Sequence, residues 1–151
     1  MIKRVHHIGI AVKNLKESTA LYEMLLGIKA EIHEASSQRV TEACFKLGGE
    51  VEIDLLEPIG DDSAVAKFLE KRGEGLHHIA LEVGDIKADL KEMEHKGVQL
   101  IDKAPREGVA GQIGFLHPKS ANGVLIELIE PKDKEDNTPN HARQFIKKMI
   151  S

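Results

Sequence analysis

The chain has 151 residues, of which 41% are hydrophobic and 30% are charged. This length suits one compact domain with a core, and the composition has no signature of disorder. The 21 basic and 25 acidic residues give a net charge of −4, which provides no overall basic field for nucleic acid or an anionic membrane. We therefore expect neither as a partner.

The single cysteine, Cys44, excludes an internal disulfide and a zinc site built from thiolates. It lies in an apolar stretch, where a small core residue is expected rather than a nucleophile. The apolar run at 8–12 is too short for a membrane span or the core of a signal peptide. These features predict a cytoplasmic protein.

In the first half, the expected elements are a strand, a helix and three further strands. The strand at 5–12 reads VHHIGIAV, and a helical stripe that stops at Gly27 predicts a helix over about 15–26. Short strands follow near 30–35, 41–47 and 50–56, the last two joined by a glycine turn. This first module spans 5–58.

A connecting helix is expected at about 62–72, with Asp61 or Asp62 as its N-cap. The second module, 76–131, repeats the first, with a strand at 77–83, a helix over about 86–96 that ends at Gly97, and strands near 99–101, 113–117 and 124–129. We expect a single domain over 1–131. The segment 132–151 is interpreted as a polar linker followed by a short helix at 142–150.

Two matches in the same order indicate that the modules are duplicates. VHHIGIAV at 5–12 returns as LHHIALEV at 76–83, so that His7 aligns with His78. VEIDLLEP at 51–58 returns as VLIELIEP at 124–131, so that Asp54 aligns with Glu127. An internal repeat of this kind predicts two structurally equivalent units.

Strict alternation along a strand assigns the two histidines of each pair to opposite faces. His7 and His78 would lie on the more open faces, and His6 and His77 would lie with the aliphatic residues. In the closing strands, Asp54 and Glu127 lie opposite an apolar face, where an isolated carboxylate is costly.

Two histidines and two carboxylates related by a repeat form a candidate cage for one divalent metal. Each of the four could instead be a structural histidine or a solvated carboxylate, but their recurrence in matching register favours the cage. We expect replacement of His6 to reduce stability before it reduces metal binding, and replacement of His7 to do the reverse. The remaining histidines lack a matched carboxylate and are expected to be surface or packing residues: His33, His95, His117 and His141.

These paired units resemble the vicinal oxygen chelate superfamily, which includes glyoxalase I, extradiol dioxygenases and fosfomycin resistance proteins. Within it, the sequence is most similar to the methylmalonyl-CoA epimerases. The stretches that carry the similarity lie within 5–131 and read HHIGIAV, EIDLLEPIGDDSAVAKFLEKRGEGLHHIALEV and FLHPKSANGVLIELIEP.

The resemblance implies an α+β fold in which two tandem βαβββ modules form a cup-shaped mixed sheet around one metal site. The implied ligands of one divalent ion are His7, Asp54, His78 and Glu127, with cobalt favoured and zinc, manganese or nickel as alternatives. Relatives often have Gln or Glu in place of Asp54, whose shorter side chain could lengthen its metal contact or admit a water. Glu127 and Glu42 are the implied acid–base carboxylates, although Glu42 could equally be a surface residue.

The implied activity interconverts (R)- and (S)-methylmalonyl-CoA by proton abstraction and reprotonation through an enolate, with this acyl-CoA as the small-molecule partner. Gly9, Ala11 and Ala80 would leave room for the malonyl head. Lys119 and Ser120 could contact polar parts of coenzyme A. Some members of the family are dimers, so a homodimer is compatible with the resemblance.

Three other functions fit the same fold. A glyoxalase I-type lactoylglutathione lyase also moves a proton beside a metal-bound oxygen. A ring-cleaving dioxygenase would use two histidines and one carboxylate on iron, which the fourth candidate ligand disfavours. A protein that sequesters small molecules such as drugs would need no metal.

Overall fold

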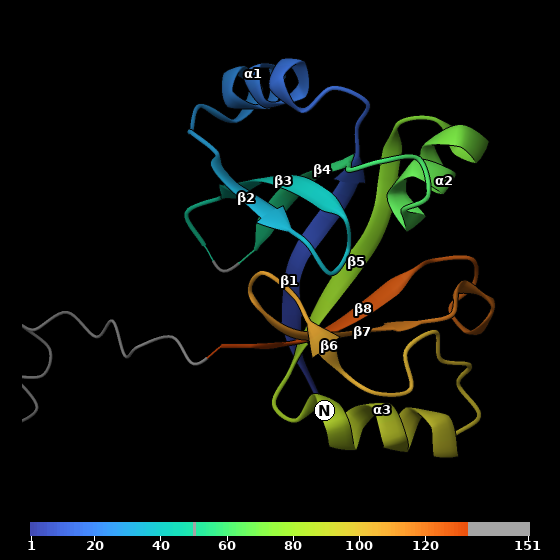
Figure 1. Cartoon of the computed structure of the whole chain (residues 1–151). Coiled ribbons are helices and arrows are strands. Elements are labelled where there is room, and N and C mark those ends of the chain that lie inside the picture. Colours follow the sequence, from blue (N-terminus) through green and yellow to red (C-terminus); the bar gives the residue numbers. More distant parts are fainter. Residues whose placement is uncertain (50, 133–151) are drawn as a thin grey trace, which may run out of the picture.

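The computed structural model describes residues 1–49 and 51–132 of the chain (Figure 1). The strands are β1 (Ile2–Ala11), β2 (Glu31–Ala35), β3 (Val40–Lys46), β4 (Glu52–Pro58), β5 (Gly75–Val83), β6 (Arg106–Glu107), β7 (Gly111–Leu116) and β8 (Ile126–Pro131). The helices are α1 (Leu15–Leu26), α2 (Ala64–Arg72), α3 (Ile86–His95) and the short 3-10 helix η1 (Pro118–Ser120).

All the strands form one curled mixed sheet in the order β2-β3-β4-β1-β5-β8-β7-β6. β1 and β5 pair antiparallel at the centre, and each also pairs in parallel with the last strand of its own module, β4 or β8. Figure 1 shows β1 and β5 running together between the strands of the two modules. The predicted pair of βαβββ modules in a cup-shaped sheet is therefore confirmed.

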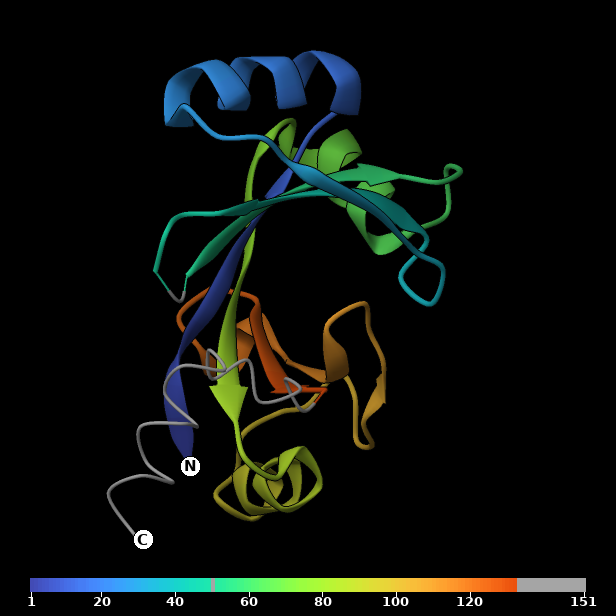
Figure 2. The same ribbon diagram turned by 90° about the vertical axis from the view of Figure 1, so that its left-hand side faces the viewer.

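Helices α1 and α3 cover the outer, convex side of the sheet, one for each module, and lie at opposite ends of the molecule in Figure 2. Below α1, Phe45 and Leu55 are fully buried, and in the other module Leu90 of α3 and Leu128 of β8 are buried in one shared cluster. Each such side chain contributes about 1.5–3 kcal/mol by leaving water. These two clusters fill the convex side, while buried apolar residues such as Leu56 and Ile129 line the concave side together with polar groups.

The helices of the two modules begin in equivalent ways. Asn14 caps α1 by accepting a hydrogen bond from the backbone N–H of Glu17, and Asp85 caps α3 in the same manner. The repeated Glu-Pro at the end of each closing strand supplies a second acceptor. Glu57 accepts from the Leu15 N–H at 2.5 Å, and Glu130 accepts from the Ile86 N–H at 2.9 Å.

β1 is interrupted at its histidine pair. Along the ladder with β5, Val5 pairs with Leu81 and His7 pairs with Ala80, so that His6 is an extra residue without an opposite partner in the register. An extra residue of this kind is a β-bulge, which increases the local twist and redirects side chains.

β5 carries the equivalent bulge. Gly9 pairs with His78 and Ile10 pairs with Leu76, so that His77 is the extra residue on this strand. The two bulges are related by the same approximate two-fold symmetry as the modules.

The bulges overturn one expectation from the sequence. His6 and His77 do not project with the aliphatic residues, because both line the same concave cavity as His7 and His78. Strict alternation fails here, since each strand has one residue more than its partner at this point.

Two expected boundaries were also wrong. The connecting helix begins at Ala64 and is capped by Ser63, because the buried Ser63 hydroxyl accepts from the Ala66 N–H while Asp62 is exposed and pairs with Arg39. The strand expected at 99–101 is a single bridge between Leu100 and Leu116, and the short β6 takes the edge position instead.

The predicted linker and helix within 132–151 lie outside the described residues, apart from residue 132. Of the helices in the described part of the chain, none has both the length and the apolar character needed to span a membrane.

Candidate active site

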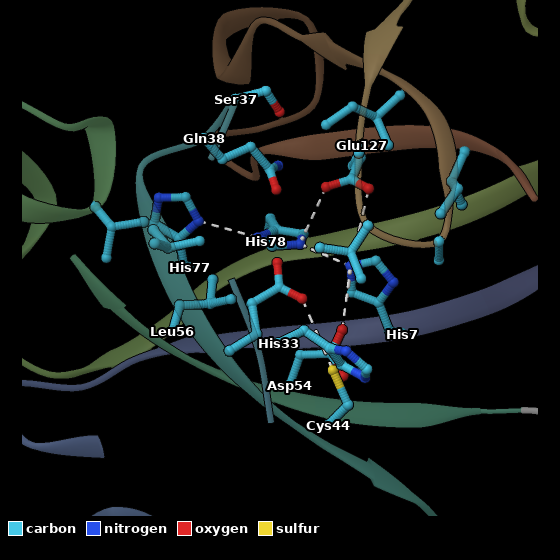
Figure 3. Close-up of a pocket in the computed structure, with 18 of the residues that line it drawn as sticks. His7, His33, Ser37, Gln38, Cys44, Asp54, Leu56, His77, His78 and Glu127 are labelled. Atoms are coloured by element: carbon cyan, nitrogen blue, oxygen red, sulfur yellow. Dashed lines mark hydrogen bonds and ion pairs between the residues drawn. The ribbon is translucent and has the colours of Figure 1, made fainter. Parts of the chain in front are cut away.

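The concave face of the sheet encloses a cavity of about 460 Å³ lined by residues of both modules. This volume lies within the usual range for small-molecule sites. Figure 3 shows His7, Asp54, His78 and Glu127 pointing toward one another inside it. The four polar side chains are therefore gathered in a cavity whose walls also include buried hydrophobic residues.

Sheet register places His7 and Glu127 in one row across neighbouring strands. His7 on β1 lies opposite Ala80 on β5, and Ala80 lies opposite Glu127 on β8. The small Ala80 side chain therefore separates a histidine of one module from the carboxylate of the other.

An equivalent row contains His78, Gly9 and Asp54 on β5, β1 and β4. A Cβ atom on Gly9 would lie only 2.3 Å from Cε1 of His78, because the imidazole ring rests directly on the glycine backbone. The space at Gly9 is thus filled by the His78 ring, and the expectation that it leaves room for a malonyl head was wrong.

The four side chains are close to one another at their polar tips. The Nε2 atoms of His7 and His78 are 3.0 Å apart, and His78 Nε2 is 3.3 Å from a Glu127 carboxylate oxygen. His7 Nε2 lies 3.9 Å from Glu127 and 3.7 Å from Asp54. The ligand atoms of His7, His78 and Glu127 all lie within 4.8 Å of one another, whereas Asp54 forms a second group of this kind with Glu42 and Cys44.

Burial sets the charge of these groups. The pKa of His7 falls to about 3 because the ring is buried and lies beside His6, and burial lowers the pKa of His78 well below its usual value. Burial also raises the pKa of Asp54 and of Glu127 to about 8, with Glu42 adding to both shifts. The imidazoles are therefore neutral at pH 7, which is the form that binds metals.

The arrangement fits a divalent cation. Oδ1 of Asp54 is buried and has no hydrogen-bond partner among the described residues, and a buried carboxylate oxygen without a partner is costly. Two neutral imidazoles and two carboxylates are a common donor set for zinc, cobalt and related ions. A cation bound among them would place positive charge beside the two carboxylates, which the neutral histidines cannot do.

Glu42 is not a surface residue. It projects from β3 into the cavity, only 8% of its surface is exposed, and burial raises its pKa. Cys44, two residues further on, donates a long hydrogen bond of 3.7 Å to Glu42. Burial raises the pKa of the Cys44 thiol, which therefore stays protonated and is a poor nucleophile.

Among the cavity residues that were not predicted from the sequence are His33 and Arg106. His33 is exposed, as expected of a surface or packing residue, but it also lies opposite Glu42 in the β2–β3 register and lines the cavity. Arg106 on β6 also lines the cavity, and its guanidinium lies 5.5 Å from the centre of the Phe115 ring. The short β6 has no hydrophobic pattern, so nothing in the sequence placed Arg106 near the site.

Lys119 and Ser120 lie in η1, and neither lines a described cavity. The Ser120 hydroxyl accepts a hydrogen bond from the Gln99 N–H at 2.8 Å, which fixes the chain after α3. A contact of these two residues with coenzyme A stays a prediction.

A second cavity of about 480 Å³ lies beside the first and shares His77 and His78 with it. Its floor is largely apolar and includes Leu76, which is 69% exposed. Its lining also includes three cations of α2: Lys67, Lys71 and Arg72.

The comparison with known protein families identifies the superfamily to which the chain belongs. Residues 6–117 match the family described as the glyoxalase/bleomycin resistance protein/dioxygenase superfamily, and the chain is a member of it. Its paired modules and its concave site are those of this class.

Individual relatives are more specific. A Bacillus subtilis protein described only as uncharacterized, YqjC, is 41% identical over 90% of this chain and 98% of its own length. The mitochondrial methylmalonyl-CoA epimerase of Dictyostelium discoideum is 42% identical over 85% of this chain and 79% of its own. A variant of the Streptomyces coelicolor methylmalonyl-CoA epimerase, solved in complex with 2-nitronate-propionyl-CoA, is 38% identical with a TM-score of 0.82 and covers 90% of this chain and 99% of its own. Within the superfamily, the chain belongs to the family of the methylmalonyl-CoA epimerases.

Proposed function

We propose that the protein is a metal-dependent epimerase that interconverts (R)- and (S)-methylmalonyl-CoA. The observation that carries this proposal is a pair of buried carboxylates, Glu42 and Glu127, which come from different modules and line one cavity. Membership of the epimerase family supports it.

The reaction requires a group on each face of the reacting carbon. The proton to be removed lies between a thioester carbonyl and a carboxylate, so that its loss gives an enolate. Return of a proton to the opposite face inverts the centre. One carboxylate must therefore accept the proton while the other donates one.

Glu127 and Glu42 suit these two roles. In the metal-free protein, burial raises the pKa of Glu127 to about 8 and also raises the pKa of Glu42. A carboxyl group that accepts or returns a proton near neutral pH is suited to acid–base catalysis, and a bound cation would lower the pKa of Glu127 from this value. Their opposed origins on β8 and β3 allow them to reach a bound substrate from two sides. We propose Glu127 and Glu42 as the two acid–base residues.

We propose that His7, Asp54, His78 and Glu127 hold one divalent ion. Such an ion, when bound, supplies Lewis-acid stabilisation of the negative charge that develops on the substrate oxygens. Cobalt is proposed on the family resemblance, with zinc, manganese and nickel as alternatives to be compared. Asp54 also offers a buried oxygen that has no other described partner.

We propose that the second cavity receives the coenzyme A arm of the substrate. The phosphate groups of coenzyme A are negative, and Lys67, Lys71 and Arg72 provide positive charge along one side of this cavity. The exposed apolar floor suits the less polar pantetheine chain. Because His78 lines both cavities, an acyl group continuous with that arm would enter the metal-binding cavity.

A direct comparison of substrates tests the proposed activity. The purified protein is given (R)-methylmalonyl-CoA or the hemithioacetal of glutathione and methylglyoxal, and product formation is followed. We expect conversion of the first substrate only. Conversion of the hemithioacetal alone would identify a lactoylglutathione lyase, and tight binding of apolar drugs by metal-free protein without turnover would identify a sequestering protein.

We also propose a cytoplasmic location and a homodimer, as the composition and the family resemblance suggest. Sedimentation equilibrium of the purified full chain measures its mass, and a mass equal to one chain at micromolar concentration would contradict the dimer. Cell fractionation tests the location.

A further inference from the structure

The doubled histidines are connected by their ring nitrogens. Nδ1 of His6 lies 2.8 Å from Nδ1 of His7, and Nδ1 of His77 lies 3.0 Å from Nδ1 of His78. The paired rings are nearly perpendicular, with interplanar angles of 81° and 87° and centroid separations of 5.1 and 5.2 Å. Figure 3 shows His77 beside His78 on the side away from His7.

The two bulges make these contacts possible. Adjacent residues on a regular strand point to opposite faces, so that neighbouring imidazoles could not meet at their Nδ1 atoms. The bulge at His6 and the bulge at His77 bring both rings of each pair into the cavity. The same device is present in both modules, so that the contact is a repeated feature of the fold.

Two imidazole nitrogens at this distance either share one proton or direct their lone pairs at a common cation. A histidine that binds a metal through Nε2 carries its proton on Nδ1, and this N–H usually donates to an acceptor that fixes the ring. The Nε2 atoms of His7 and His78 face each other across 3.0 Å, whereas their Nδ1 atoms face His6 and His77.

We propose that His6 and His77 are positioning residues that accept hydrogen bonds from the Nδ1–H groups of His7 and His78 and so direct both Nε2 lone pairs at one divalent cation. This inference rests on the metal site of the proposed function. It replaces the expectation that His6 matters for stability before metal binding.

The surroundings of His77 favour an oriented ring. The edge of the His77 imidazole packs against Phe68 of α2, with ring centroids 5.0 Å apart. His77 is thus fixed from outside by the connecting helix and contacts His78 on its inner side. In the other module, His6 is 5% exposed and occupies the equivalent place beside His7.

Zinc affinity of matched variants tests the proposal. His6→Leu and His77→Leu replace the acceptor with an apolar side chain. His6→Asn and His77→Asn instead place an amide oxygen near the position of Nδ1, so that an acceptor is still present. Titration of the metal-free full chain with Zn²⁺ should show a 10–100-fold loss of affinity in the leucine variants. The asparagine variants should stay within a few-fold of the wild type.

A purely structural role predicts a different pattern. Each asparagine variant would then lose as much affinity as its leucine counterpart, or the leucine variants would bind Zn²⁺ like the wild type, and either result would overturn the proposal. Should one leucine variant fail to fold, the other tests the same contact in the opposite module. Thermal unfolding of the metal-free variants separates loss of stability from loss of affinity.

A spectroscopic measurement examines the hydrogen bond itself. In zinc-loaded protein with ¹⁵N-labelled histidine, we expect scalar coupling across the hydrogen bond between the Nδ1 atoms of His6 and His7, and between those of His77 and His78. Absence of both couplings would refute the inference. If the wild type binds no Zn²⁺, the proposed metal site fails, and the couplings of the metal-free protein still report whether the rings are paired.

Discussion

Gly9 shows how a single residue sets the geometry of the site. Its missing side chain lets the His78 imidazole rest on the backbone of β1, so that His78 reaches His7 and Glu127. Ala80 takes the equivalent place between His7 and Glu127 in the other row of the sheet. Small residues at these two positions are therefore required by the candidate ligands rather than by the substrate.

Gly9→Ala should displace the His78 ring, because the new Cβ would lie 2.3 Å from Cε1 of the imidazole. We expect Zn²⁺ affinity to fall by about 10–100-fold, the range found when groups that orient a metal ligand are lost. The matched control is Gly49→Ala, where a new Cβ meets nothing within 4 Å. Calorimetric titration of both variants measures the difference, and equal affinities would contradict this account of Gly9.

The two proposed acid–base carboxylates make separable predictions. Glu127→Gln should abolish epimerisation, because this residue is both a base and a candidate metal ligand. Glu42→Gln should block proton exchange on one face only. Uptake of deuterium from heavy water into each enantiomer of methylmalonyl-CoA measures this, and an undiminished rate in both variants would exclude the two-base scheme.

The sequence predicted the identity of the four candidate ligands, but not how they pair across the sheet. Recurrence at matching places in two modules identified His7, His78, Asp54 and Glu127, and the structure brings all four into one cavity. The sequence could not predict that each carboxylate lies in the row of the other module's histidine, since that depends on how β1 and β5 pair. Arg106 was missed because a two-residue edge strand carries no periodicity.

Among the elements, the central strands depart most from the pattern in the sequence. Alternation predicts the faces of β4 and β8 correctly, with Asp54 and Glu127 opposite the residues packed under α1 and α3. It fails in β1 and β5, where a bulge at each histidine pair adds a residue. A bulge cannot be predicted from hydrophobic periodicity. Here its effect is that both histidines of each pair line the cavity.

Helix α2 connects the modules and borders both cavities. Its cations Lys67, Lys71 and Arg72 line the cavity proposed for the coenzyme A arm, while its apolar face packs on β4 and β1 through Val65. A helix in this place can affect substrate binding without taking part in proton transfer.

Lys71→Glu should therefore raise KM for methylmalonyl-CoA by about five- to tenfold and leave kcat nearly unchanged, because an attractive charge is replaced by one that repels the phosphates in the ground state and the transition state alike. Lys91→Glu, an exposed lysine on α3, is the matched control. Steady-state kinetics with methylmalonyl-CoA and with a methylmalonyl thioester that lacks the phosphates distinguish the cause. An equal rise of KM for both substrates, or in the control variant, would contradict this role of α2.

Across the whole molecule, the approximate two-fold arrangement concentrates buried acids and bases at the interface of the modules. In the metal-free protein, the pKa values of Asp54 and Glu127 are about 8, against 3.8 and 4.5 for the unperturbed groups. The folded state then binds more protons than the unfolded state up to about pH 8, so that their stabilising contribution is lost as pH rises. His7, with a pKa of about 3 against 6.5, acts in the opposite sense, but only below pH 6.5.

The metal-free protein should accordingly lose stability between pH 6.5 and about 8.5. Each carboxyl group can contribute at most about 1.4 kcal/mol per pH unit. Thermal unfolding in the presence of a chelator measures the effect, with Glu127→Gln as a control whose Tm should depend less on pH. A wild-type Tm that rises over this window, or a slope equal to that of the control, would contradict the assigned burial of these carboxyls.

The decisive measurement for a metal-dependent epimerase is whether proton exchange depends on the bound metal. Wild-type protein is incubated with (R)-methylmalonyl-CoA in heavy water before metal removal, after metal removal with a chelator, and after addition of Co²⁺. We expect deuterium uptake and formation of the (S) enantiomer both to disappear on metal removal and both to return with Co²⁺. Full exchange by protein verified to be free of metal, or no exchange in any of the three states, would contradict this expectation.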